Sequence, residues 1–227
     1  MTLTPAEGEA LWLSLKVGLV AVLATLPLAY ALAWLLARGR FWGRGALDVL
    51  VHLPLVLPPV VTGYLLLLAF GRHGPIGRAL DLIGVSVLFS WTGAAIAAGI
   101  MALPLMVRAI RLSIEAVDPK LEGAARTLGA GRWRAFRTIT LPLSLPGLLA
   151  GAVLGFAKAM GEFGATITFV SSIPGETRTL PLAIYGVLQA PGGEDAALRL
   201  SLIAVALSVG ALGASEWLAR RAKAHAL

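Results

Sequence analysis

Five long apolar stretches constrain this chain more than any other feature of its sequence. They cover residues 17–36, 53–70, 82–107, 138–157 and 200–215. A helix needs roughly 20 apolar residues to cross a hydrocarbon core of about 30 Å, and in lipid it satisfies its own backbone hydrogen bonds. We therefore expect an all-α fold, a polytopic membrane helical bundle with about five transmembrane helices.

Two of these stretches differ from a simple uncharged span. Pro54, Pro58 and Pro59 crowd the start of the second stretch, which predicts a broken or kinked entry covered by neighbouring protein. We expect the fourth stretch to continue past Lys158 and Glu162 as one helix.

The composition favours lipid over water as the solvent. Of the 227 residues, 58% are hydrophobic and 14% are charged, whereas a typical soluble domain carries about 25% charged residues. The net charge of +7 could suggest nucleic acid, but the basic residues lie in short segments between apolar stretches. The chain has no cysteine, which excludes disulfides and thiolate metal sites. We expect contact with a lipid bilayer and none with nucleic acid.

Lysine and arginine residues in the connecting segments predict the orientation. One side of the membrane would hold 13 of them and the other side four, and cytoplasmic loops carry the excess. The larger set comprises Arg38, Arg40, Arg44, Arg108, Arg111, Lys120, Arg126, Arg132, Arg134, Arg137, Arg220, Arg221 and Lys223. We therefore expect a multi-pass inner-membrane protein whose N-terminus lies outside and whose C-terminus is cytoplasmic. The chain starts without a basic n-region, so the first stretch is interpreted as a retained helix.

The number of spans depends on residues 171–193. Their uncharged run, 179–193, has only 15 residues, and a sixth crossing there would place the basic C-terminal residues outside. We expect an external hairpin or a re-entrant element, with six spans as the alternative. No internal repeat or linker is evident, so residues 1–227 are interpreted as a single transmembrane domain.

The polar segment of about residues 111–138 has a helical pattern of its own. Asp118 and Pro119 form a helix-start signal, and Gly129 is typical of the position after a helix end. Between them runs one apolar stripe of small and medium residues, which suits a close docking surface. The stripe comprises Leu121, Ala124, Ala125 and Leu128. An amphipathic loop lying at the lipid headgroups is the alternative interpretation.

The residue identities in this segment resemble the EAA-type loop of ABC importer permeases. The matching residues are Glu122, Gly123, Ala124, Ala125, Gly129, Ile139, Leu141 and Pro142. In that family the loop forms a coupling helix that sits in a cleft of the cytoplasmic ATPase. One departure is that the usual pattern places Glu directly before the Ala pair, whereas Gly123 intervenes here. The departure concerns the role of Glu122 and leaves the placement of the loop unchanged.

Four further blocks extend the resemblance to molybdate importer permeases. They cover residues 52–67, 103–147, 161–181 and 215–220. The resemblance implies a type I ABC importer fold and alternating access for molybdate or tungstate. It also implies a homodimer, two cytoplasmic ATPase subunits and a periplasmic oxyanion-binding protein. Sulfate and thiosulfate permeases share GEFGA-like residues, but they are usually longer and work as two different chains.

Nucleotide chemistry is not expected in this chain. A P-loop needs lysine directly after glycine, and none of the four lysines has that position, so ATP and magnesium would bind to the partner ATPase. The three histidines are widely separated, so we expect no metal site, no cofactor and no catalytic residue. Two other classes remain as alternatives. A secondary transporter would usually show inverted repeats, and a membrane enzyme would need a reactive constellation.

Lys158 and Glu162 lie four residues apart, on one helix face within or just beyond an apolar span. Ionisable residues at such depth usually face the interior of a bundle. One interpretation is an internal ion pair, and the other places Lys158 beside an anion path. Thr166 and Thr168 are weaker candidates for hydroxyls that line the same path.

Overall fold

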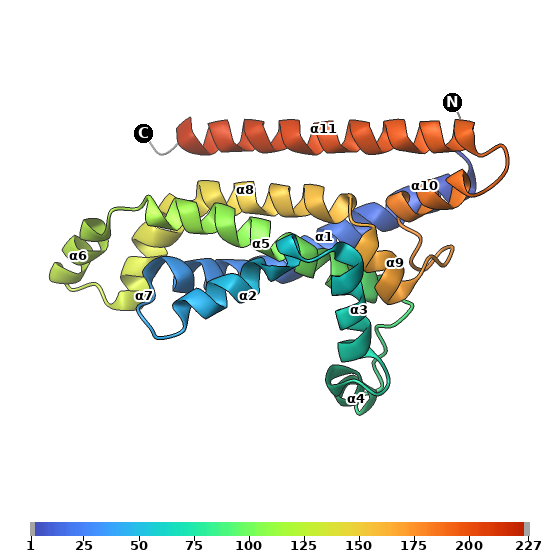
Figure 1. The fold of residues 1–227 in the computed structure, drawn as a ribbon. Helices are drawn as coiled ribbons and strands as arrows, with labels where there is room; N and C mark the ends of the chain where they lie inside the picture. The colour runs from blue at the N-terminus through green and yellow to red at the C-terminus, as the bar shows by residue number, and fades with distance from the viewer. Residues whose placement is uncertain (1–2, 225–227) are drawn as a thin grey trace.

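The computed structural model describes residues 3–224, and in its last helix the side chains of 211–212 and 214–224 lie outside the description. Every regular element of the described residues is helical (Figure 1). The elements are α1 (Pro5–Arg38), α2 (Arg44–Val56), α3 (Pro59–Phe70), α4 (Pro75–Asp81), α5 (Trp91–Glu115), α6 (Pro119–Thr127), α7 (Arg132–Ala135), the π-helix η1 (Phe136–Thr140), α8 (Leu141–Met160), α9 (Gly164–Val170), α10 (Leu180–Leu188) and α11 (Glu194–Ala224).

Within the described residues, three helices are long and apolar enough to cross a membrane. They are α1, α5 and the continuous run Arg132–Met160, which joins α7, η1 and α8. The pair α2 and α3 adds a fourth span if it is counted as one broken crossing. The prediction of an all-α, multi-span membrane protein is thus confirmed. The predicted fifth span, 200–215, falls inside α11, and its crossing stays a prediction because some of its side chains lie outside the description.

The predicted break in the second stretch is confirmed. α2 ends at Val56, α3 begins at Pro59, and the two helices are bent by 115°. Pro58 and Pro59 lack the amide hydrogens that would continue the hydrogen bonds of α2. As a result α3 leaves the bundle as an arm with α4 at its tip (Figure 1).

The predicted third and fourth spans are each wrong at one end. Residues 82–90 precede α5, because Ser90 caps that helix by accepting a hydrogen bond from the amide of Gly93 (3.4 Å). The fourth span stops at Met160, where Gly161 forms the C-cap, so Glu162 lies in a break and not in a helix. Apolar composition alone shows neither boundary, since both depend on local capping.

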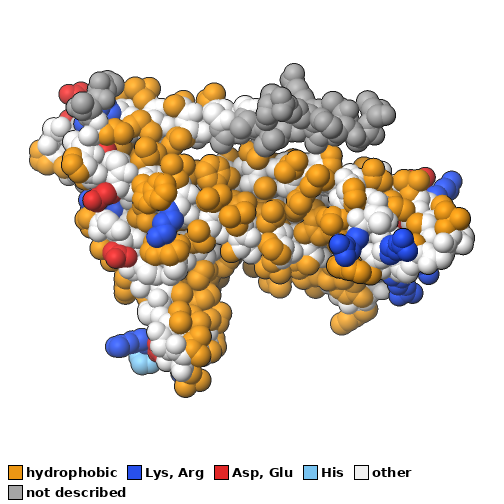
Figure 2. Space-filling model, turned by 180° about the vertical axis from the view of Figure 1, so that it is seen from behind, with side chains coloured by type: hydrophobic (Ala, Val, Ile, Leu, Met, Phe, Trp, Pro, Cys, Tyr) orange, Lys and Arg blue, Asp and Glu red, His pale blue; other side chains and the backbone are white. Residues whose placement is uncertain are grey.

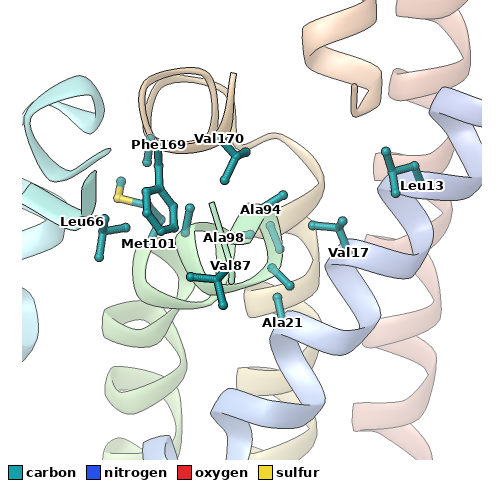
Figure 3. Packing of buried hydrophobic residues seen from close by; sticks show 14 residues of the cluster. Leu13, Val17, Ala21, Leu66, Val87, Ala94, Ala98, Met101, Phe169 and Val170 are labelled. Atoms are coloured by element: carbon teal, nitrogen blue, oxygen red, sulfur yellow. The ribbon is translucent and has the colours of Figure 1, made fainter. Parts of the chain in front are cut away.

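Small residues allow α1, α5, α8 and α9 to pack closely. One buried cluster joins Val17 of α1, Ala94 and Ala98 of α5, and Phe169 and Val170 of α9, and these side chains point towards one another (Figure 3). Small side chains let helix backbones approach within van der Waals contact, which drives helix association in lipid. The bundle therefore has a rigid centre from which α3 and α6 project.

The segment after α9 forms a short helix. α10 has nine residues, about 13 Å at 1.5 Å per residue, which is too short for a hydrocarbon core of about 30 Å. It packs against α11 and α1, and the amide of Leu180 donates a hydrogen bond to the Ser14 hydroxyl (2.5 Å). This geometry favours a hairpin or a re-entrant element over a sixth crossing.

Charged side chains gather towards the two ends of the bundle and at the tip of the α3–α4 arm on the face seen in Figure 2. The surface between them on that face shows many hydrophobic side chains and no charged ones. Such a band is the surface expected against a hydrocarbon core.

Candidate functional site

The predicted helix in the 111–138 segment is confirmed as α6. Asp118 is its N-cap and accepts a hydrogen bond from the amide of Lys120 (2.9 Å). At its other end the amide of Gly129 donates to the carbonyl of Arg126 (3.1 Å), and the amide of Ala130 donates to the carbonyl of Ala125 (3.0 Å). These two bonds form a Schellman motif, which requires the left-handed φ of 87° at Gly129.

The apolar stripe on α6 faces away from the rest of the protein. None of the residues Pro119–Thr127, all of which are described, is buried. Leu121 is 46% exposed and Leu128 is 89% exposed, while Ala124 is exposed and Ala125 is half-buried. Figure 1 shows α6 beyond the ends of α5 and α8. The stripe is therefore available to a partner.

Glu122 points about 100° around α6 from Leu121, away from the stripe. Its carboxylate accepts a hydrogen bond from the hydroxyl of Thr140, which is fully buried at the end of η1. Gly123, which separates Glu122 from the Ala pair, is exposed, and a methyl group added at its Cα would meet no described atom within 4 Å.

The remaining predicted residues of this segment lie where η1 meets α8. Ile139 and Leu141 are half-buried, and Pro142 directly follows η1 at the start of α8. The basic and aromatic residues before them form helix rather than a loop. Phe136 contacts Tyr30 and Trp34 of α1 edge to face, which fixes this end of the run against α1.

Lys158 and Glu162 form an ion pair of 2.6 Å at the end of α8 that is far from α6. The second carboxylate oxygen of Glu162 accepts a hydrogen bond from the amide of Ala165 (3.0 Å), in the first turn of α9. Glu162 is thus a capping residue as well as an ion-pair partner. Its side chain is only 2% exposed, whereas that of Lys158 is 28% exposed, so Lys158 is the more accessible of the two.

The two candidate threonines lie on α9 and differ in their surroundings. Thr166 is buried, at 2% exposure. The hydroxyl of Thr168 donates to the carbonyl of Gly164 (2.9 Å) within its own helix, and Thr168 also packs against Gly63 of α3. The structure thus places Lys158 and Glu162 together at the junction of α8 and α9, while both threonines lie further along α9.

Sequence reasoning missed a polar cluster between α2 and α5. Arg111 contacts the carboxylates of Asp48 (3.0 Å) and Glu115 (2.8 Å), and His52 lies 3.1 Å from Asp48. The four-residue spacings within each helix are a signal that could have indicated the two local pairs. The bond between Arg111 and Asp48 joins different helices and has no such signal. Among the described residues no group of histidines and carboxylates could hold a metal ion.

This architecture defines a class: a multi-pass helical membrane protein with an exposed, capped helix between two of its spans. The fold is similar to that of a chain of a bacterial alginate ABC transporter, solved in complex with a periplasmic protein, with a TM-score of 0.76 at 20% identity over 96% of this chain and 80% of the other. A chain of the MetNI methionine ABC transporter gives a TM-score of 0.67 at 17% identity, covering 96% and 94% of the two chains.

The sequence identifies the family. Residues 26–223 match the profile of the binding-protein-dependent transport system inner membrane component, and the chain belongs to this family. It is therefore a transport subunit of the inner membrane and not an enzyme, and it works with an ATPase and a periplasmic binding protein. A secondary transporter and a membrane enzyme are excluded by this membership.

Similar proteins include two molybdenum transport system permease proteins named ModB. That of Escherichia coli K12 is 60% identical over 227 residues, which cover 100% of this chain and 99% of the relative. That of Haemophilus influenzae is 58% identical over 216 residues, 95% and 94% of the two chains. The sulfate transport system permease protein CysW of Escherichia coli K12 is 38% identical over 204 residues, 88% and 70% of the two chains.

Proposed function

We propose that this chain is the permease of an ATP-driven importer for molybdate, with tungstate as an alternative substrate of the same size and charge. The observation that carries the proposal is the 60% identity to a molybdenum permease over the whole length of both chains. The sulfate permease shares only 38% and extends beyond this chain, since 70% of its length is covered. Sulfate and thiosulfate are therefore the second candidate substrates.

Uptake by cells that express the chain with its ATPase and binding protein tests this substrate. We expect saturable molybdate uptake that tungstate competes away and that a large excess of sulfate leaves intact. The measurement is accumulation of labelled molybdate, with cells lacking only the permease as the control. Sulfate uptake at a rate comparable to that of molybdate would transfer the proposal to the second candidate.

The exposed stripe of α6 supports its assignment as the coupling helix that docks the ATPase. A partner that covers Leu121 and Leu128 would remove apolar side chains from water, which stabilises association. ATP-driven closure of two ATPase subunits would then displace α6 in each of two permeases. That displacement would switch a path between inward-open and outward-open states, all within one transmembrane domain of residues 1–227.

A homodimer is supported by the break between α2 and α3. Val56 is 81% exposed, and Pro58 and Pro59 beside it are also exposed. Non-helical backbone at membrane depth is tolerated only where protein covers it or where it lines a water-filled cavity. A second copy packed against α3 would supply that cover and form the path at the interface. The native mass of the purified complex tests this, and a single permease per complex would contradict it.

The orientation with the N-terminus outside and the C-terminus cytoplasmic rests on the charge distribution. The segment 108–137, which contains α6, holds seven of the 19 lysine and arginine residues. Basic residues accumulate in cytoplasmic loops, and the ATPase can reach α6 only from that side. Because the chain has no cysteine, single cysteines placed before α1 or after α10 can be labelled from outside, and protection of both sites would contradict this orientation.

Lys158 is the residue of the α8–α9 junction most suited to meet an anion, because its side chain is partly exposed and carries a positive charge. We expect Lys158→Met to lower oxyanion uptake by at least about tenfold, since an ionic contact with the substrate is worth on the order of 1.5–3 kcal/mol. The measurement is the initial uptake rate at equal amounts of membrane-inserted permease. Lys158→Arg, which keeps the charge, is the matched control. Uptake by Lys158→Met at the wild-type rate would leave the pair a structural one.

A further inference from the structure

The buried hydroxyl of Thr140 has its hydrogen-bond acceptor on a different helix. Thr140 is 0% exposed at the end of η1, and its hydroxyl donates to the carboxylate of Glu122 on α6, 18 residues earlier in the chain. Thr138, two residues away, is exposed and donates to the carbonyl of Arg134 (2.8 Å) within its own run of helix. A buried hydroxyl needs a partner, and for Thr140 that partner is the side chain of Glu122.

This bond is the one side-chain hydrogen bond between α6 and another helix among the described residues. At its start α6 follows the end of α5, which Arg38 holds by donating to the carbonyls of Ile114 (3.1 Å) and Val117 (2.6 Å). At its end the chain passes through the Schellman turn at Gly129 into α7. Between these two backbone connections, the carboxylate of Glu122 is the direct link from α6 to the start of a long span.

Thr140, the partner of Glu122, lies at the end of the π-helical turn η1. η1 closes with a hydrogen bond from the amide of Leu141 to the carbonyl of Phe136, five residues back. Such turns occur within longer helices and are frequent at functional sites. Phe136 packs against Tyr30 and Trp34 of α1, and the hydroxyl of Tyr30 bonds to that of Ser144 on α8 (2.8 Å). A displacement at the end of η1 therefore reaches both α8 and α1.

The position of Glu122 in its motif explains its direction. Residues on an α-helix advance by about 100° each, so a glutamate one place earlier points about 100° away from the usual one. Leu121, Ala124 and Leu128 occupy the exposed face, and Glu122 points inward to Thr140. The partner-facing surface of α6 thus consists of the stripe, without this carboxylate.

We propose that Glu122 is a positioning residue that transmits the movement of α6 to the start of α8 through its hydrogen bond with Thr140. The inference rests on the proposed docking of the ATPase on α6. Movement of the ATPase displaces α6, and the hydrogen bond between Glu122 and Thr140 transmits this displacement to η1. The contacts of η1 and α8 with α1 then carry it to both spans. Without the bond the ATPase still docks and hydrolyses ATP, but the spans respond less to each cycle.

Removing either half of the bond tests this role. Glu122→Met removes the acceptor, and Thr140→Val removes the donor at nearly constant volume. Glu122→Gln keeps an acceptor oxygen and should restore function. Thr138→Val is the matched control, because its hydroxyl bonds only within its own helix. The measurement is the number of ATP molecules hydrolysed per molybdate imported by the reconstituted importer, together with the amount of ATPase that co-purifies and the melting temperature.

We expect Glu122→Met and Thr140→Val each to raise the ATP consumed per anion by about tenfold, the factor that a lost hydrogen bond to a charged group supports. The double variant should be no worse than either single one, since both remove one bond. ATPase co-purification should stay at the wild-type value, and the melting temperature should fall by only a few degrees, because one buried hydrogen bond is lost. A wild-type ratio of ATP to anion in both variants overturns the inference, and so does loss of the ATPase in Glu122→Met alone. Failure of the wild-type chain to retain any ATPase would instead refute the docking proposal.

Discussion

Leu128→Glu is expected to abolish retention of the ATPase while the permease still inserts in the membrane. Leu128 is 89% exposed at the end of the stripe on α6, so the free permease loses nothing when it changes. In the docked complex, however, a carboxylate would lie unpaired in an apolar contact. Truncating or charging a central interface residue costs about 2 kcal/mol or more, roughly 30-fold or more in Kd. Co-purification of the ATPase with a tagged permease measures this directly.

A matched control for Leu128→Glu is available next to α4, at the tip of the α3–α4 arm. Leu82, which follows α4, is 88% exposed, and Leu82→Glu introduces the same charge at equal exposure away from α6. We expect that variant to retain the ATPase at the wild-type level. If both variants retain it, the stripe of α6 is not the docking surface. If both lose it, the effect is general and not specific to α6.

Gly147→Val is expected to prevent stable folding of the bundle. A Cβ atom at Gly147 would overlap the Cβ of Ser113 and lie 3.0 Å from the backbone oxygen of Ala109, so α8 would have to move away from α5. Overpacking a tight contact typically costs about 1–3 kcal/mol, and a backbone contact that cannot relax lies at the upper end. Monodisperse yield in detergent and the melting temperature measure the effect, and we expect little folded protein.

Substitutions at two other glycines provide comparisons for the effect expected at Gly147. At Gly151 the added Cβ would lie 3.0 Å from a side-chain carbon of Ile110 and 3.1 Å from the Met106 oxygen, so Gly151→Ala should be milder. Gly210, on α11, has no described atom within 4 Å of that position, which makes Gly210→Val the matched control. Normal yield of Gly147→Val would show that α5 and α8 are not held at this distance.

The local pattern was sufficient to predict α6 because both of its ends are defined by nearby residues. Asp118 bonds to an amide two residues on, and the Schellman bonds at Gly129 close within five residues. Such signals depend on the backbone of one short segment, so they survive in any fold. The approximate positions of α1, α5 and α8 were predictable for a similar reason, since lipid demands about 20 apolar residues whatever the neighbours are.

The boundaries that failed depend on local caps, which apolar composition does not show. The apolar stretch continues past Met160, yet the helix ends there because Gly161 caps it and Glu162 caps α9 instead. Hydropathy indicates whether a segment lies in lipid or in water, but it does not indicate the direction of the helix axis. For that reason the 115° bend between α2 and α3 appeared in the sequence only as a cluster of prolines, without an angle.

The sequence by itself determined a helical membrane protein, its distribution of charge, and a capped helix between two spans with an apolar stripe. These features follow from hydrophobicity and from hydrogen bonds over a few residues. Only the tertiary structure decided that the stripe is exposed and that Glu122 points inward to Thr140. It also decided that Arg111 joins Asp48 across two helices. These pairs are brought together by helix packing, and no spacing along the chain encodes which face of one helix meets which face of another.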